Sequence, residues 1–220
     1  VAQADCGGVL ADLADGSYTF TATATDAAGN SASASYTWLV DTVAPTVSIE
    51  GPATPNSSDS ASFTVTSADA SSGLASTTCT LDTVAVTCGD AASGLSDGSH
   101  DYVATATDDA GNSASATHTW VVDTTDPAVA ISDSPSDPNN SDAADFTVTS
   151  SDGGSGLAST TCTLDGAAQA DCGGVASGLA DGSHTFTATA TDAAGNSASA
   201  SYTWLVDTTD PSVSVTGPSD

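Results

Sequence analysis

The sequence contains no lysine and no arginine but 28 aspartate and glutamate residues, so its formal net charge at pH 7 is −28. Because no cationic side chain can neutralise phosphates, nucleic acid is excluded as a partner and binding to an anionic membrane surface is disfavoured. No internal ion pair can form except with one of the three histidines in its protonated form. Such a chain repels itself, so we expect solvent cations or bound metal ions to stabilise its compact form.

Large side chains and long apolar runs are scarce as well. Aromatic residues make up 5% of the chain, so any core must consist largely of alanine. No apolar run is long enough to span a bilayer, which predicts no direct membrane insertion. No stretch has helical periodicity, and no Ser–His–Asp or Cys–His set recurs in register. We therefore expect neither a helical fold nor an enzyme.

One stretch occurs three times, starting at Asp15, Asp97 and Asp181. Its turn segment, DAAGN or DDAGN, recurs with periods of 82 and 84 residues. In the last copy, residues alternate strictly before and after this turn, a period of two that is typical of half-buried strands. One face is expected to hold His184, Phe186, Ala188, Ala190, Ala198, Ala200, Tyr202, Trp204 and Val206, and the other to hold the Thr and Ser residues and Leu205.

The period divides the chain into tandem units of about 83 residues. We predict the C-terminal half of one unit at 1–41, complete units at 42–123 and 124–207, and the first strand of a further unit at 208–220. Each complete unit has about seven short strands separated by turn-forming loops. This pattern predicts an all-β fold of tandem antiparallel β-sandwiches of the immunoglobulin-like kind. Because the chain starts and stops within a unit, we interpret it as part of a longer array.

The cysteines occur at matching positions of the units. Cys79 and Cys88 are nine residues apart, and Cys162 and Cys172 are ten apart. One pair in each unit predicts a disulfide across a hairpin and an oxidising, extracellular compartment. A zinc site is the alternative, but it would need two further ligands near each pair. Cys6 matches Cys88 and Cys172, and we expect its partner upstream of Val1.

Tyrosine and histidine replace one another between copies. Tyr18, His100 and His184 occupy one position, where immunoglobulin-like folds place a tyrosine corner. His118 alternates with tyrosine in the same way at a second position. A histidine that exchanges with tyrosine is expected to pack and not to catalyse.

The segments LADGSYTFTATATDAAGN and YTWLVDTVAP resemble the bacterial immunoglobulin-like repeat modules of large secreted surface proteins and adhesins. The resemblance covers the whole chain. It implies a stalk of tandem sandwiches at a cell surface, often stiffened by calcium at the module junctions.

Acidic residues recur in three places in each complete unit: the incoming linker, the loop after the second strand, and the last hairpin turn. An immunoglobulin-type sandwich brings these places to one pole. Three or four converging carboxylates would repel unless they bound a hard divalent ion, and calcium accepts irregular oxygen ligands better than magnesium does. Alternatively, each aspartate only caps a turn. The predicted metal ligands are Asp41, Asp69, Asp108 and Asn112 in one unit, and Asp123, Asp126, Asp152, Asp192 and Asn196 in the next.

Two functional hypotheses follow. The first is a structural stalk or filament segment of an extracellular surface protein, with neighbouring repeats of the chain or filament as its partners. The second is an adhesive module that recognises a glycan or protein ligand, which could also bind elsewhere in the parent protein. Two sequons, at Asn56 and Asn139, are candidate glycosylation sites in the same loop of each unit.

Overall fold

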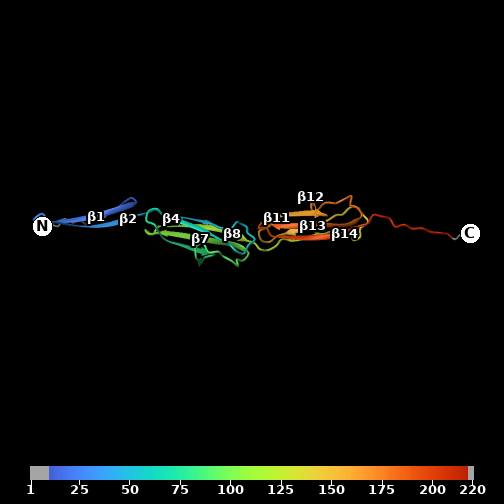
Figure 1. Ribbon diagram of the computed structural model, residues 1–220, viewed down its shortest axis with the longest axis horizontal. Coiled ribbons are helices and arrows are strands. Elements are labelled where there is room, and N and C mark those ends of the chain that lie inside the picture. Colours follow the sequence, from blue (N-terminus) through green and yellow to red (C-terminus); the bar gives the residue numbers. More distant parts are fainter. Residues whose placement is uncertain (1–9, 218–220) are drawn as a thin grey trace. The chain divides into compact units, whose positions relative to one another are not determined.

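The computed structural model describes residues 10–217, and every regular element in this range is a β-strand. The chain divides into two compact units. The first contains the described residues up to Pro52 together with Ala61–Ala92 and His100–Thr119, and the second contains Ala53–Ser60, Ser93–Ser99 and the residues from Trp120 onward. The strands are numbered in chain order, and Figure 1 labels most of them. The all-β prediction is confirmed.

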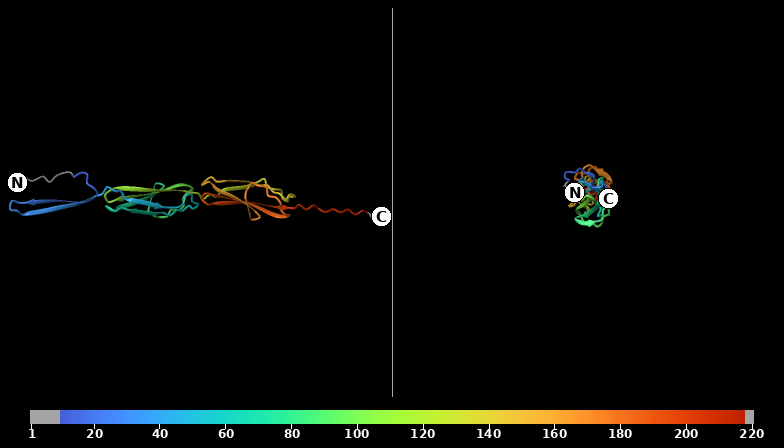
Figure 2. Two further views of the ribbon diagram at one scale, coloured as in Figure 1. Left: turned by 90° about the horizontal axis from the view of Figure 1, so that it is seen from above. Right: turned by 90° about the vertical axis from the view of Figure 1, so that its left-hand side faces the viewer.

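The repeat at 124–207 lies within the second unit and forms a two-layer sandwich (Figure 2). Its strands are β9 (Ala128–Ser132), β10 (Thr147–Ser151), β11 (Leu157–Leu164), β12 (Ala167–Gln169), β13 (Gly182–Asp192) and β14 (Ser197–Val206). One layer is the pair β9–β10, and the other is an antiparallel sheet in the order β12-β11-β13-β14. The buried core between them consists of Ala144, Phe146, Cys162, Phe186, Ala188, Trp204 and Val206.

The preceding repeat has the same topology. Its strands are β3 (Thr46–Glu50), β4 (Thr64–Ala68), β5 (Leu74–Leu81), β6 (Val84–Val86), β7 (Gly98–Asp108) and β8 (Ser113–Val122). Each complete repeat therefore has six strands, where the sequence predicted about seven. The segment before the last hairpin adds only isolated bridges, Ala61 to Ala92 and Ala144 to Ala176. The first copy is described as a hairpin of β1 (Gly16–Thr25) and β2 (Ser31–Val40).

The two faces of the last hairpin are those expected from the alternation. On the inner face, Phe186, Ala188 and Ala190 are at most 4% exposed. On the outer face, hydroxyls pair across β13 and β14 with oxygen–oxygen distances of 3.0, 3.0 and 2.8 Å, in the pairs Thr185–Thr203, Thr187–Ser201 and Thr189–Ser199. These cross-strand bonds satisfy the outer face without any charged group.

The connection between β5 and β6 is a two-residue turn with positive φ at both positions, 48° at Asp82 and 72° at Thr83. The corresponding turn of the next repeat has Asp165 at 48° and Gly166 at 81°. Two-residue hairpin turns of this kind favour glycine, and a β-branched residue at positive φ is strained.

We expect Thr83→Gly to stabilise its repeat by about 1 kcal/mol, because it removes this strain without removing a described contact. Gly166→Thr introduces the same strain into the other repeat and should destabilise that repeat by a similar amount. Urea denaturation followed by NMR signals of each repeat measures both effects. Equal midpoints for the wild type and both variants would contradict the expectation.

Candidate metal centre

The last hairpin turn of each copy is built on one aspartate and one asparagine. In the third copy, Asp192 Oδ1 accepts hydrogen bonds from the N–H groups of Gly195 at 2.7 Å and Asn196 at 2.8 Å, and Asp192 Oδ2 accepts one from Asn196 Nδ2 at 2.7 Å. Gly195 has φ = 99°, which glycine adopts without strain. Asp108 with Asn112 and Asp26 with Asn30 repeat the carboxylate–asparagine bonds.

In the repeat at 124–207, a linker residue and a loop residue lie next to this turn. Asp123, directly after β8, accepts a hydrogen bond from the Ser155 N–H at 2.6 Å through Oδ2, and its carbonyl accepts one from Asn196 Nδ2 at 2.7 Å. Asp152 Oδ2 accepts from the N–H groups of Gly154 and Gly156 at 3.0 and 2.7 Å. A Cβ at Gly154 would lie 2.5 Å from the Asp123 carboxylate, so the approach of this carboxylate to the loop requires glycine.

The second repeat assembles the same three places. Asp41 accepts hydrogen bonds from the N–H and the hydroxyl of Ser72, while Asp69 Oδ1 accepts from the N–H groups of Ser71, Ser72 and Gly73. Asn112 Nδ2 donates to the Asp41 carbonyl at 3.0 Å. The linker, the loop and the turn are thus joined by hydrogen bonds in both repeats.

Two trios of carboxylates result. Asp41, Asp69 and Asp108 each offer an oxygen within 4.8 Å of the other two, and Asp123, Asp152 and Asp192 do the same. Asp108, Asp123 and Asp192 are 1% exposed and Asp41 is 8% exposed. Buried carboxylates normally have a charged partner, but this sequence offers no lysine or arginine for that role.

The linker carboxylates are held in the ionised form. The Ser72 hydroxyl, followed by the backbone N–H groups of Val43 and Ser72, holds the pKa of Asp41 below its usual value despite the opposing effect of burial. Hydrogen bonds from Ser155 do the same for the pKa of Asp123. Asp41 and Asp123 therefore contribute anionic oxygen donors, which is the chemistry that hard divalent cations bind.

The remaining predicted ligands have other placements. Asn112 and Asn196 turn their amide nitrogens toward the carboxylates, so in this arrangement each orients a carboxylate and a backbone carbonyl. Asp126 is exposed and does not belong to the trio of its repeat. The sequon asparagine Asn139 is half-buried, with Oδ1 accepting from the Ser141 N–H and Nδ2 donating to the Ala143 carbonyl. Asn56 is half-buried too and accepts from the Ser58 N–H.

Sequence reasoning missed a contact to the linkers. Asp181, in the loop before β13, accepts hydrogen bonds from the Thr208 N–H, the Thr208 hydroxyl and the Thr209 hydroxyl at 2.7–2.8 Å. Asp97 binds Thr124 and Thr125 in the same way, and Asp15 binds Thr42. The recurrence of Asp-Gly-Ser before each hairpin and of Asp-Thr after it was the available signal.

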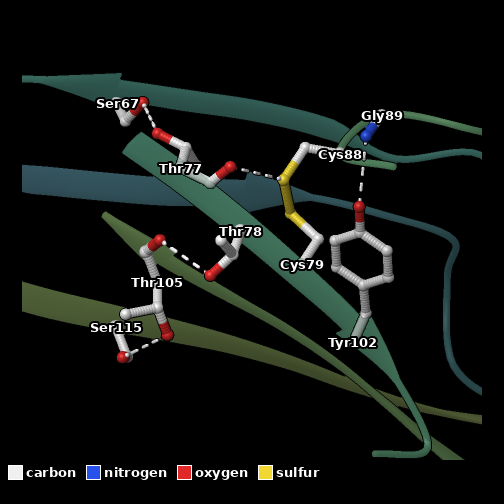
Figure 3. Close-up of a disulfide and its surroundings, with 9 residues drawn as sticks. All are labelled: Ser67, Thr77, Thr78, Cys79, Cys88, Gly89, Tyr102, Thr105 and Ser115. Carbon is white, nitrogen blue, oxygen red and sulfur yellow. Dashed lines mark hydrogen bonds between the residues drawn. A yellow bond between two sulfur atoms is a disulfide. The ribbon is translucent and has the colours of Figure 1, made fainter. Parts of the chain in front are cut away.

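Both expected disulfides are present. Cys79 is bonded to Cys88 and Cys162 to Cys172, with Cα–Cα distances of 5.2 and 5.3 Å. Figure 3 shows the first bond beside the Tyr102 hydroxyl, which accepts a hydrogen bond from the Gly89 N–H at 3.1 Å. Cys6 lies outside the described residues.

The tyrosine and histidine side chains that replace one another between copies bind the same kind of acceptor, a main-chain carbonyl oxygen. Tyr18 donates to the Ala14 carbonyl at 2.7 Å, and His184 Nε2 lies 2.8 Å from the carbonyl of Ala180, at the same position of its copy. His118 Nε2 is 3.0 Å from the Pro52 carbonyl. These rings thus bind loop carbonyls, as the packing interpretation requires.

Among the described residues, no helix is long and apolar enough to cross a membrane. No curated protein matches the sequence. Among solved structures, fibronectin(III)-like modules of Clostridium thermocellum CbhA are similar to it at 15% identity, with a TM-score of 0.44 over 73% of this chain and 94% of that chain. A tetra-tandem repeat from the extending region of a large adhesion protein is 24% identical, with a TM-score of 0.32 over 89% of this chain and 58% of that one. The model of the bacterial Ig-like domain matches residues 8–42 and 125–208, more than half of the sequence, and the chain therefore belongs to the bacterial Ig-like domain family.

Proposed function

We propose that this chain is a segment of a structural stalk on a bacterial surface, and that calcium at the linker-facing pole of each complete repeat stiffens it. Repetition of one module with few differences between copies favours a structural role over a catalytic one. The disulfide in each repeat favours an extracellular location. The observation that carries the proposal is the pair of carboxylate trios, each with two buried members and one half-buried member.

The competing interpretation is that these aspartates only cap turns. Asp26 makes the same bonds to Asn30 while exposed, so the turn forms without a carboxylate trio. Turn capping alone therefore gives no reason for the linker, the loop and the turn to bring two buried carboxylates and one half-buried carboxylate within 4.8 Å of one another. Calcium would be held by Asp41, Asp69 and Asp108 in one repeat and by Asp123, Asp152 and Asp192 in the next. The bound ion supplies the positive charge that this sequence lacks.

Calcium should raise the stability of both complete repeats. Extracellular calcium modules bind with dissociation constants of about 10⁻⁴–10⁻³ M. A tenfold excess over that constant then adds about 1.4 kcal/mol for each site. Isothermal titration calorimetry should find two ions per chain, and thermal denaturation at fixed ionic strength should shift upward relative to excess chelator.

Asp192→Asn and Asp108→Asn should each remove one ion, because asparagine keeps the shape but not the charge. Asp26→Asn is the matched control, since it alters the same turn outside any trio found in residues 10–217. Equal ion binding by all three variants would contradict the proposed sites. If the two ions bind but small-angle scattering gives the same maximum dimension with and without chelator, the stiffening role is wrong.

A further inference from the structure

His184, at the start of β13, lies between two hydrogen-bond acceptors. Its Nδ1 is 2.7 Å from Asp165 Oδ2, and its Nε2 is 2.8 Å from the Ala180 carbonyl oxygen. A carbonyl and an ionised carboxylate can only accept, and a neutral imidazole can donate from only one of its nitrogens. Both bonds therefore form together only when both ring nitrogens carry a proton. The geometry requires an imidazolium.

The charged group that faces His184 is Asp165, from the turn between β11 and β12. Asp165 Oδ1 also accepts from the Thr185 N–H at 2.8 Å, and its own N–H donates to the Thr185 carbonyl at 2.9 Å. From β14, the uncharged Trp204 ring faces the imidazole with a centroid distance of 5.6 Å, which favours a cation. Asp181, three residues before His184, binds Thr208 and Thr209 instead.

These contacts link the histidine to the linker. The Ala180 carbonyl, to which His184 binds, belongs to the residue before Asp181. Asp181 in turn holds the backbone N–H and the hydroxyl of Thr208 and the hydroxyl of Thr209. Loss of the bond to Ala180 would free the corner that presents the Asp181 carboxylate.

We propose that His184 is a pH switch. In its protonated form it fixes the Ala180–Asp181 corner and thereby the linker at Thr208 and Thr209, and its deprotonation loosens both. The first copy has a tyrosine at the position of His184. There Tyr18 donates its phenol proton to the Ala14 carbonyl, and Asp15 binds the Thr42 N–H at 3.0 Å. The choice of histidine or tyrosine at this position thus decides whether the following linker responds to pH.

The pH range follows from the two partners. The bonds to Ala180 and then to Asp165 raise the pKa of His184. The stabilisation from His184 is therefore complete below about pH 6.5, and it is lost as the pH rises through the higher pKa of the folded state. The bonds from His184 and then Thr185 lower the pKa of Asp165. The contribution of Asp165 to stability is therefore complete above about pH 3.9, and it is lost as the pH falls through the lower pKa of the folded state. Both stabilising contributions are therefore present between about pH 4 and the raised pKa of His184.

The proposed pH switch is tested by amide exchange of Thr208. The exchange is measured by NMR on the full chain and normalised for intrinsic exchange. Excess chelator keeps calcium from contributing, so the result is independent of the proposed metal sites. Between pH 5.5 and pH 9, the protection of Thr208 should fall by about fivefold, the effect of one lost hydrogen bond. Protection of Thr42, held by Asp15 beside Tyr18, should stay constant over this range. A parallel response of both amides would overturn the proposal.

His184→Tyr should remove the pH response of Thr208 while leaving Thr42 unchanged. If this variant folds and Thr208 still responds to pH, the histidine is not the switch. If it does not fold, the comparison of Thr208 with Thr42 in the wild-type chain still decides. Imidazole ¹⁵N shifts give a direct readout: both nitrogens of His184 should be protonated at pH 6, and one unprotonated nitrogen there would overturn the proposal.

Discussion

Replacing Trp204 by alanine should unfold the repeat at 124–207 or leave it marginally stable. Trp204 is 1% exposed and packs edge-on against Phe146, with ring centroids 5.3 Å apart. A buried Trp-to-Ala change costs about 3–5 kcal/mol. A domain of this size has only about 4–12 kcal/mol of stability. Ala144 and Ala188, its neighbours in the core, are too small to fill the space.

Trp204→Phe is the matched control. Within the described residues, the buried indole Nε1 of Trp204 has no hydrogen-bond partner, so phenylalanine removes volume but no hydrogen bond. We expect this variant to lose less than half as much stability as the alanine variant. Urea denaturation followed by circular dichroism and by NMR signals of this repeat measures both. If the two variants were equally stable, packing around Trp204 would not hold the repeat together.

Removing the Cys162–Cys172 bond should have the second largest effect. The bond closes a loop with a sequence separation of 10 residues. The chain-entropy relation gives about 2.7 kcal/mol for a loop of this size. The double variant Cys162→Ser/Cys172→Ser should lower the denaturation midpoint of its own repeat and leave the preceding repeat unchanged.

The reciprocal variant Cys79→Ser/Cys88→Ser should act only on the preceding repeat, where the separation is 9 residues. Reductant should reproduce both effects in the wild-type chain and do nothing further to a chain that lacks the four cysteines of these two disulfides. A serine double variant as stable as the oxidised wild type would show that the bond contributes nothing to the folded state.

The sandwich could be predicted because its signal is local. The alternation around DAAGN places Phe186, Ala188 and Ala190 on one face whatever the rest of the chain does, and the structure buries all three. The convergence of Asp123, Asp152 and Asp192 could be predicted from topology, since an immunoglobulin-like connection brings those loops to one pole.

Contacts that depend on the details of loop conformation could not be predicted. The bond from Thr208 to Asp181 spans 27 residues, and the Asp-Gly-Ser sequence that supplies it resembles an ordinary turn. Asp165 lies 19 residues before His184, so the sequence alone showed only a histidine that replaces tyrosine. The isolated bridges Ala61–Ala92 and Ala144–Ala176 could not be predicted either, because a bridge of one residue pair leaves no alternating pattern to distinguish it from a loop.

The hydroxyl pairs on the outer sheet face have a consequence for how like-charged copies meet. The six strands of the repeat at 124–207 contain a single carboxylate, Asp192, which is 1% exposed. All other carboxylates of this repeat are in its loops and linkers, so its strands carry no exposed carboxylate, whereas Glu50 and Asp101 are exposed on strands of the preceding repeat. Added salt therefore screens the carboxylates of the loops and linkers of this repeat and has little effect on its outer sheet face. Two copies of the repeat at 124–207 that approach through their outer sheet faces bring rows of Thr and Ser together, and the net charge of −28 for the whole chain overstates their repulsion in that orientation.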